Sequence, residues 1–270
     1  MRNVIILGSG RSGTSMVAGT LAQAGYFMGE YLWEARDANP KGFFEDKEIN
    51  SINEDILAPL IGERLHLPAI KKLRIPEKVF FRNRPVRGQR WLASIPLTQQ
   101  ITASDNIQAR IKAVVQQDPY CFKDPRFSYT LPLWRPYLTN AVFVCVFRDP
   151  ASTALSILKE CQTLPKLRHP IKGIRLSWRQ AINIWTLMYE HILLKHYRAD
   201  EDWLFLHYNQ VIAGEGLKKL AELTQASVDI SFPDPKIRRS YAEETIAKKA
   251  DKLYQKLCTL AAYQETESTA

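Results

Sequence analysis

Residues 3–15 read Asn-Val-Ile-Ile-Leu-Gly-Ser-Gly-Arg-Ser-Gly-Thr-Ser, an apolar run that is followed at once by a glycine-rich segment. The run Asn3–Leu7 predicts a buried strand, and a helical pattern begins at Thr14. Glycines let the intervening backbone curl so that successive N–H groups point at one anion, and the helix N-terminus adds partial positive charge. Ser12, Thr14 and Ser15 add hydroxyl donors. This stretch therefore predicts a phosphate-binding loop between a strand and a helix.

The loop departs from the Walker A pattern at its most informative position. That pattern ends in Gly-Lys-Ser/Thr, whereas Gly13 is followed here by Thr14. A kinase or NTPase would therefore lack the lysine that contacts the γ-phosphate. The cation of this loop is Arg11, next to Gly10, where it would stabilise charge that builds on a bridging oxygen during group transfer. The strand expected at 141–147 does not end in a magnesium-binding carboxylate, and we expect no metal site.

Apolar runs alternate with helical patterns along the rest of the chain. Further buried strands are expected at 120–123, 141–147 and 203–207. Helices are expected at 14–24, 46–57, 104–117, 152–160, 174–197, 216–223 and 241–260. This alternation predicts an α/β fold: a single P-loop-type domain with a central parallel β-sheet flanked by helices. We expect the domain to span 1–263, with an insert or lid around 60–100 and a flexible tail at 264–270.

The composition excludes the disordered and fibrous classes, because 46% of the 270 residues are hydrophobic and 24% are charged. The 37 Lys and Arg residues against 28 Asp and Glu give a net charge of +9, which indicates an anionic partner. Four scattered cysteines without a CxxC pair argue against a disulfide framework or a zinc site. The apolar runs are too short for a membrane span or a secretory signal, so we expect a cytoplasmic protein.

A second anion site is indicated after the strand expected at 141–147. Arg148 follows this strand directly, and Pro150 suits the first turn of the next helix. Ser156 lies about two turns into that helix. The two side chains would converge on one phosphate, with a bidentate contact from the guanidinium group. Alternatively, Arg148 pairs with a surface carboxylate and Ser156 is an ordinary helix residue.

Together these features resemble the sulfotransferase family that uses 3′-phosphoadenosine 5′-phosphosulfate (PAPS). In that family a lysine or arginine precedes Ser-Gly-Thr in the 5′-phosphosulfate loop, and Arg11 with residues 12–15 is similar. The interval between Arg148 and Ser156 is similar to that of the family's 3′-phosphate site. The resemblance spans about residues 1–240, and it implies that PAPS is the co-substrate and that no metal is needed.

Two further segments extend the nucleotide site that the resemblance implies. Leu206–Gln210 resembles the family's strand followed by Tyr-Glu-Asp, which implies that Tyr208 approaches the adenine; here an Asn-Gln pair replaces the acidic residues. Lys236–Arg239 is similar to the basic segment that closes over the 3′-phosphate, although the usual glycine is missing. The resemblance thereby implies roles for Arg238 and Arg239.

Sulfuryl transfer to a hydroxyl needs a general base near the acceptor oxygen. Cytosolic members of the family use a histidine two residues after a strand-end lysine, whereas here Lys123 is followed at that interval by Pro125. Other branches use a glutamate after the first helix, which implies Glu45, and its aromatic neighbours would partly desolvate that carboxylate. Glu45 could instead favour the N-terminus of helix 46–57. Lys123 would assist the leaving phosphate or pair with Asp124. The reserve candidates for the base are Glu30, Glu34 and Asp124.

Residues 71–90 concentrate positive charge next to aromatic residues. The basic side chains are Lys71, Lys72, Arg74, Lys78, Arg82, Arg84, Arg87 and Arg90, against Glu77, and the aromatic ones are Phe80, Phe81 and Trp91. This pattern favours a lid over a small-molecule, carbohydrate or lipid acceptor, and the charge would suit an anionic one. Contact with nucleic acid or anionic lipid, or a solvated loop, would give the same pattern; we expect no nucleic-acid partner.

The function expected from these features is transfer of a sulfuryl group from PAPS to a hydroxyl or amine of an unidentified acceptor, with release of adenosine 3′,5′-bisphosphate. Arg11, Glu45 and Lys123 are the candidate catalytic residues. One alternative is a P-loop phosphotransferase of kinase type, which would need magnesium and against which Thr14 counts. The other is a non-catalytic protein that binds the nucleotide through the same surfaces.

Overall fold

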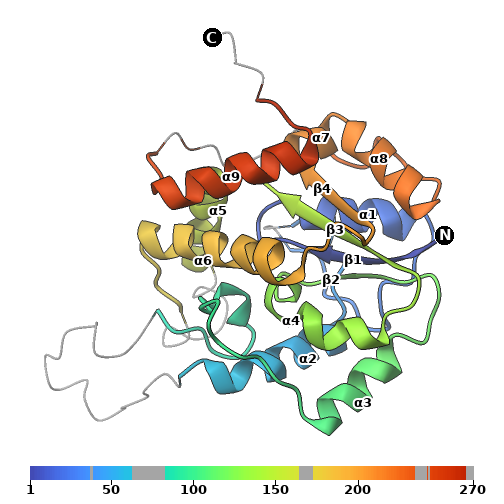
Figure 1. Ribbon diagram of the computed structural model, residues 1–270, viewed down its shortest axis with the longest axis horizontal. Coiled ribbons are helices and arrows are strands. Elements are labelled where there is room, and N and C mark those ends of the chain that lie inside the picture. Colours follow the sequence, from blue (N-terminus) through green and yellow to red (C-terminus); the bar gives the residue numbers. More distant parts are fainter. Residues whose placement is uncertain (37–38, 63–82, 164–172, 235–241, 243, 266–270) are drawn as a thin grey trace, which may run out of the picture.

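A four-stranded parallel β-sheet forms the centre of this computed structural model, in the order β2-β1-β3-β4 (Figure 1). The structure describes residues 1–36, 39–62, 83–163, 173–234, 242 and 244–265. The strands are β1 (Asn3–Leu7), β2 (Cys121–Lys123), β3 (Ala141–Phe147) and β4 (Trp203–His207). In the register of the sheet, Val4 of β1 lies between Cys121 and Val142. The predicted α/β class and parallel sheet are confirmed.

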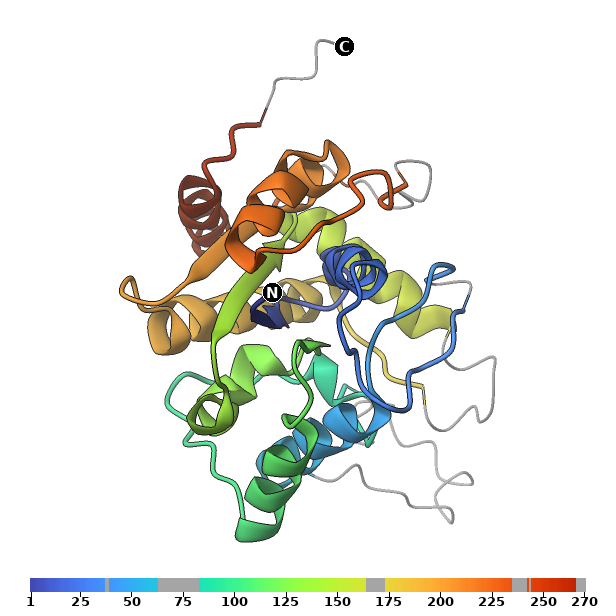
Figure 2. The ribbon, with the colours of Figure 1, turned by 90° about the vertical axis from the view of Figure 1, so that its right-hand side faces the viewer.

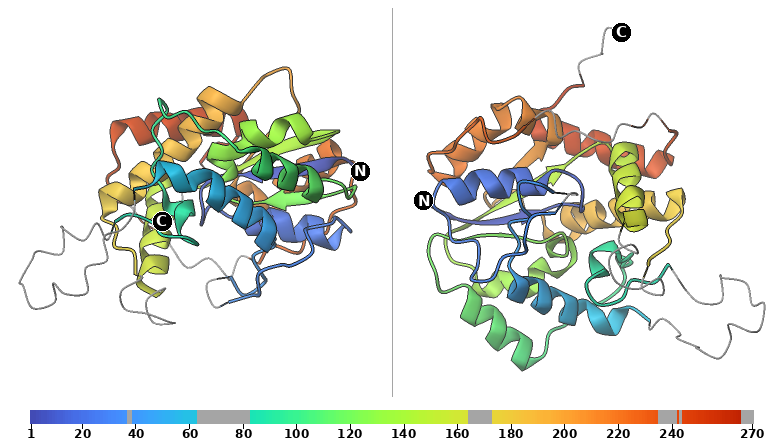
Figure 3. Two further views of the ribbon diagram at one scale, coloured as in Figure 1. Left: turned by 90° about the horizontal axis from the view of Figure 1, so that it is seen from below. Right: turned by 180° about the vertical axis from the view of Figure 1, so that it is seen from behind.

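Helices cover both faces of the sheet. They are α1 (Thr14–Gln23), α2 (Lys47–Leu57), α3 (Asp105–Val114), α4 (Phe127–Trp134), α5 (Pro150–Thr163), α6 (Trp178–His191), α7 (Tyr208–Ile212), α8 (Glu215–Thr224) and α9 (Lys248–Ala261). Short 3-10 turns span Ala58–Leu60, Arg90–Leu92 and Arg135–Tyr137, and a π-helical turn, Ile192–His196, continues α6. Figure 2 shows the sheet between α1 on one side and α6 on the other, and α1 and α8 are seen from behind in Figure 3.

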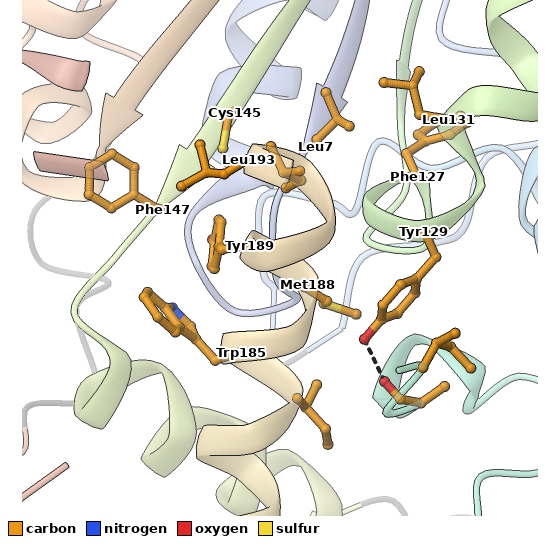
Figure 4. Packing of buried hydrophobic residues seen from close by; sticks show 14 of the residues in the cluster. Leu7, Phe127, Tyr129, Leu131, Cys145, Phe147, Trp185, Met188, Tyr189 and Leu193 are labelled. Carbon is orange, nitrogen blue, oxygen red and sulfur yellow. Dashed lines mark hydrogen bonds between the residues drawn. The ribbon is translucent and has the colours of Figure 1, made fainter. Parts of the chain in front are cut away.

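Alternate strand residues build two separate cores. Val4 and Ile6 of β1 pack with α1 and α8, whereas Ile5 and Leu7 pack with helices α2, α4, α6 and α9. In the second core, Trp185 and Tyr189 of α6 lie beside the end of β3, and their ring centroids are 4.7 Å apart (Figure 4). Because both faces are covered, the strands are continuously apolar, which explains why short apolar runs identified them.

The observed helices differ from the expected ones at several ends. The helix expected at 174–197 begins after Ser177, whose side chain forms a capping box with Gln180. The helix expected at 241–260 begins at Lys248, and α5 begins at Pro150 rather than at residue 152. Two helices, α4 and α7, were not expected: α4 contains Pro132, and α7 has only five residues. Helix α7 is too short for helical periodicity to be detected, and Pro132 interrupts the pattern of α4.

Parts of two expected segments fall outside the described residues, namely 63–82 of the expected insert and 266–270 of the expected tail. All four cysteines are buried and free. No helix in the described ranges has the length and apolar character that crossing a membrane requires.

Candidate active site

The glycine-rich loop after β1 leaves the first turn of α1 open to an anion. Gly13 precedes α1 with φ +95°, and Arg11 has φ +72°, so both lie in the left-handed region. Since Gly13 has no side chain, it cannot cap the helix, and the first turn of α1 carries no acidic residue. The N-terminal N–H groups of α1 therefore keep the partial positive charge that favours a bound oxyanion.

Two aromatic rings lie directly against the glycines of this loop. A Cβ atom on Gly10 would come within 2.6 Å of the Trp91 ring, and one on Gly13 within 2.8 Å of the Tyr208 ring. Only glycine permits this approach of ring to backbone. The loop is thus enclosed by a residue from each of two distant parts of the chain.

Replacing Gly13 by alanine is expected to cost about 2–4 kcal/mol of unfolding free energy, because left-handed strain adds to a clash with Tyr208. Gly25→Ala is the matched control: Gly25 also has positive φ, +89°, but no atom lies within 4 Å of its Cβ position. We expect the control to lose only the strain, about 1–2 kcal/mol. Urea unfolding of both variants measures the difference, and equal losses would show that Tyr208 does not press on the loop.

The hydroxyl of Ser12 points into the core rather than into the loop's ligand side. Its Oγ lies 3.0 Å from the hydroxyl of Tyr189, which donates to the carbonyl oxygen of Val146 at 2.7 Å and accepts from the N–H of Ser9 at 3.1 Å. Burial raises the pKa of Tyr189, so the hydroxyl stays protonated. Ser12, expected as a phosphate donor, therefore helps to tie the loop to α6.

A residue of helix α4 accepts a hydrogen bond from the first residue of the loop. The N–H of Gly8 donates to Oγ of Ser128 at 3.3 Å, and Nε2 of His196 donates to the carbonyl oxygen of Ser128 at 2.9 Å. Burial lowers the pKa of His196 to about 3, so this imidazole is neutral at pH 7. The start of the loop is therefore held by hydrogen bonds to buried polar groups.

A cavity of about 670 Å³ opens in front of the loop. The predicted site residues that line it are Gly10, Arg11, Gly13, Thr14, Ser15, Glu45, Lys123, Arg148, Ser156 and Tyr208. Arg238 and Arg239 lie outside the described residues, and Ser12 is turned away. The lining contains seven Arg and Lys side chains against three glutamates. This excess of positive charge would attract an anionic ligand.

Residues that follow β1, β3 and β4 in the chain meet at one end of the loop. Nε of Arg11 donates to Oγ of Ser156 at 3.1 Å, and a second nitrogen of Arg11 lies 3.9 Å from a carboxylate oxygen of Glu160. The guanidinium of Arg148 stacks over the ring of Tyr208, 4.6 Å from its centroid. Arg148 is only 6% exposed, so it is a buried residue of the cavity wall and not a surface arginine.

Glu45 and Lys123 form an ion pair beside the loop. Nζ of Lys123 contacts Oε1 of Glu45 and also donates to Oγ of Ser15 at 3.2 Å. The side chain of Lys123 is 2% exposed, and that of Glu45 is 14% exposed. The cap of α2 is Asp46, whose side chain accepts from two N–H groups of the first turn. Glu45 therefore lines the cavity while Asp46 caps the helix, and Lys123 pairs with Glu45.

The reserve candidates for a base are placed less favourably. Asp124 is fully buried and accepts hydrogen bonds from Asn50, Asn53 and Arg126. Its carboxylate is thereby committed to the structure. Glu30 and Glu34 are exposed, and neither lines the cavity.

A buried ion network in the wall of the cavity was not expected from the sequence. The guanidinium of Arg126 contacts Glu54 at 2.6 Å and Asp124 at 2.9 Å, and Arg90 contacts Glu54 at 3.1 Å. One signal was present: Arg126 lies three residues after the strand end at Lys123, and such positions face ligands in parallel sheets. Within the described ranges, no group of three or more His, Cys, Asp or Glu side chains is placed to hold a metal ion.

The chain is similar to known proteins both in sequence and in fold. The model of the Sulfotransferase family matches residues 3–216 of this chain. The sulfotransferase domain from the Synechococcus PCC 7002 olefin synthase is similar in fold, with a TM-score of 0.51 at 16% identity over 98% of both chains. The sulfotransferase domain from the curacin biosynthetic pathway has a TM-score of 0.50 at 13% identity, over 98% of this chain and 99% of its own. No curated protein matches the chain.

Proposed function

This chain belongs to the sulfotransferase family, and we propose that it transfers a sulfuryl group from PAPS to a hydroxyl or amine of an acceptor, with release of adenosine 3′,5′-bisphosphate. The observation that carries the proposal is that two groups of basic and hydroxyl side chains, each suited to bind an anion, line one cavity. The first is the loop with Arg11 and Ser15, and the second comprises Arg148 and Ser156, with Ser156 also accepting a hydrogen bond from Arg11. A donor that bears phosphate groups at both its 3′ and 5′ positions needs two such sites.

The residues present fit PAPS as the co-substrate. When bound, it would supply the activated sulfuryl group. Arg11, Thr14 and Ser15, together with the open N-terminus of α1, would hold its 5′-phosphosulfate. Arg148 and Ser156 would hold its 3′-phosphate, and the ring of Tyr208, which already lies against Gly13, would contact the adenine. Roles for Arg238 and Arg239 in covering the 3′-phosphate are part of the same proposal.

Glu45 is the proposed general base, and Lys123 is its partner. Lys123 contacts Oε1 of Glu45, and in the described part of the chain Oε2 receives no hydrogen bond, so Oε2 would take the proton from the acceptor hydroxyl. Lys123 also contacts Ser15, which places its charge between the base and the loop. Lys123 and Arg11 would therefore stabilise the negative charge that develops on the leaving phosphate oxygen.

Calorimetric titration with adenosine 3′,5′-bisphosphate and with ATP, each with and without magnesium, tests the donor assignment. We expect the bisphosphate to bind without magnesium and more tightly than ATP. Arg148→Ala is expected to weaken this binding by about 10- to 100-fold, because hydrogen bonds to charged groups contribute about 1.5–3 kcal/mol. The control is Arg198→Ala, which removes an exposed arginine that does not line the cavity and is expected to change nothing.

Two results would contradict the proposal. Tighter, magnesium-dependent binding of ATP would indicate the kinase-like alternative. Equal binding of both nucleotides, unaffected by Arg148→Ala, would show that Arg148 does not recognise a 3′-phosphate.

A further inference from the structure

A short antiparallel ladder carries Glu45 at the edge of the cavity. The N–H of Trp33 donates to the carbonyl oxygen of Glu45 at 3.0 Å, and the N–H of Lys47 donates to the carbonyl oxygen of Tyr31 at 2.9 Å. Leu32 pairs with Asp46 between these two bonds. The segment 31–33 is thereby fixed against the residues that enter α2.

The ladder places Trp33, Glu45 and Lys47 on one face. In an extended strand, alternate side chains point the same way, and directly opposite residues share a face. Trp33 lies opposite Glu45, and Lys47 is two residues beyond it. The side chains agree: Nζ of Lys47 lies 5.4 Å from the centroid of the Trp33 ring, and all three residues line the cavity. The proposed base therefore has an aromatic ring and a cation beside it.

The Trp33 ring is held in a fixed orientation. Its Nε1 donates to Oδ1 of Asn50 at 2.7 Å, and Nδ2 of Asn50 donates to the buried carboxylate of Asp124 at 2.8 Å. Trp33 is nevertheless 39% exposed, although its ring nitrogen is bonded to the buried Asn50. A rigid ring that is anchored at one edge and open on its surface can stack on a ligand without first losing side-chain entropy.

Two cations lie beside this ring, and the neighbouring carboxylate, that of Glu45, pairs with Lys123. The guanidinium of Arg36 lies 5.9 Å from the centroid of the Trp33 ring, and the ammonium of Lys47 lies 5.4 Å from the same centroid. Within the described part of the chain, neither cation forms an ion pair. The third cation of this wall, Arg87, pairs with Asp55. We call Trp33, Arg36 and Lys47 the Trp33 platform.

We propose that the Trp33 platform binds the acceptor, and that the acceptor is a planar ring that carries an anionic group such as a carboxylate. This inference rests on the proposed function, because it places the donor in the part of the cavity beside the loop and Arg148, and the acceptor in the part beside Trp33. The ring would stack on Trp33, the anionic group would face Lys47 and Arg36, and the hydroxyl to be modified would reach Oε2 of Glu45. Each partly exposed ion pair contributes little binding free energy alone. Two cations together should therefore raise the affinity for an anion about fivefold over that for its neutral isostere.

Two isosteric phenols test the proposal directly. We would titrate 4-hydroxyphenylacetate and its neutral amide, 4-hydroxyphenylacetamide, into the protein saturated with adenosine 3′,5′-bisphosphate. The anion should bind about fivefold more tightly than the amide, and the preference should shrink as salt rises from about 0.05 to about 0.5 M. Lys47→Met and Arg36→Met should each reduce the preference, and Trp33→Leu should weaken both phenols alike.

A matched control exists in α3, where the ammonium of Lys112 also lies 5.4 Å from an aromatic centroid, that of Tyr137, but outside the cavity. Lys112→Met should leave the preference unchanged. Equal binding of the two phenols, or binding of neither, would overturn the acceptor assignment while leaving the donor titration intact. A loss of bisphosphate affinity in Lys47→Met or Arg36→Met would also overturn it, since these cations would then belong to the donor. Failure of the bisphosphate to bind the unaltered protein would instead contradict the proposed function.

Discussion

Replacing Glu45 by glutamine is expected to lower the rate of sulfuryl transfer by about 10²- to 10⁴-fold, the contribution of a positioned general base. Glutamine keeps the size and polarity of the side chain but cannot accept the acceptor's proton. Affinity for adenosine 3′,5′-bisphosphate should change little, because Lys123 retains its contact with Ser15. Single-turnover transfer, measured together with nucleotide titration, separates the two effects.

The matched control is Glu48→Gln in the same helix region. Glu48 binds Arg110 at 2.7 Å and does not line the cavity, so its loss should leave transfer unchanged. If Glu45 only neutralised Lys123, Glu45→Gln would reduce stability or nucleotide affinity and leave the rate constant at saturation near normal. That result would reassign the base.

Replacing Arg126 by methionine is expected to cost about 3–5 kcal/mol of unfolding free energy. Arg126 is 4% exposed and contacts two carboxylates, those of Glu54 and Asp124, which are themselves buried. Burial lowers the pKa of Arg126, but the two facing carboxylates more than offset this and raise it, so the guanidinium stays charged. Methionine fills the space but removes the cation that Asp124 pairs with and leaves Glu54 with Arg90 alone. Chemical denaturation monitored by circular dichroism measures the loss.

Arg110→Met provides the comparison, because Arg110 also contacts two carboxylates, at 2.7 and 2.8 Å, but in a partly exposed position. Solvent screens this pair of contacts, and we expect a cost of at most about 1 kcal/mol. Similar losses in the two variants would mean that water reaches the Arg126 network, and that its carboxylates are not desolvated.

The strands of this fold could be predicted from the sequence because each is a short apolar run covered on both faces. Three of the four have the expected bounds, and β2 is one residue shorter than expected. The helix ends were predicted less well, because apolar periodicity does not mark them: α6 begins at a local capping box between Ser177 and Gln180, and it continues into the π-helical turn Ile192–His196. Helix α4 was missed because Pro132 lies within it, where sequence rules expect a helix to end.

The candidate site was predicted where it consists of contiguous residues. The loop 8–15 and Arg148 at the end of β3 could be recognised from the spacing of residues in the sequence alone. The pairing of Glu45 with Lys123 joins residues 78 positions apart, and the contact of Arg126 with Glu54 joins residues 72 apart. No local pattern encodes such pairs. The Trp33 ladder was missed for a different reason, since three residues on each side are too few for strand periodicity.

The order of the strands in the sheet bears on how the protein is made. β1 is an inner strand, and both of its neighbours, β2 and β3, lie more than a hundred residues later in the chain. On the ribosome, β1 therefore stays without a strand partner until β2 and β3 have emerged. The loop that we propose binds the donor is thus synthesised well before the strands that hold β1 in place, and a nascent chain stalled before β2 would expose β1 to aggregation and to chaperones.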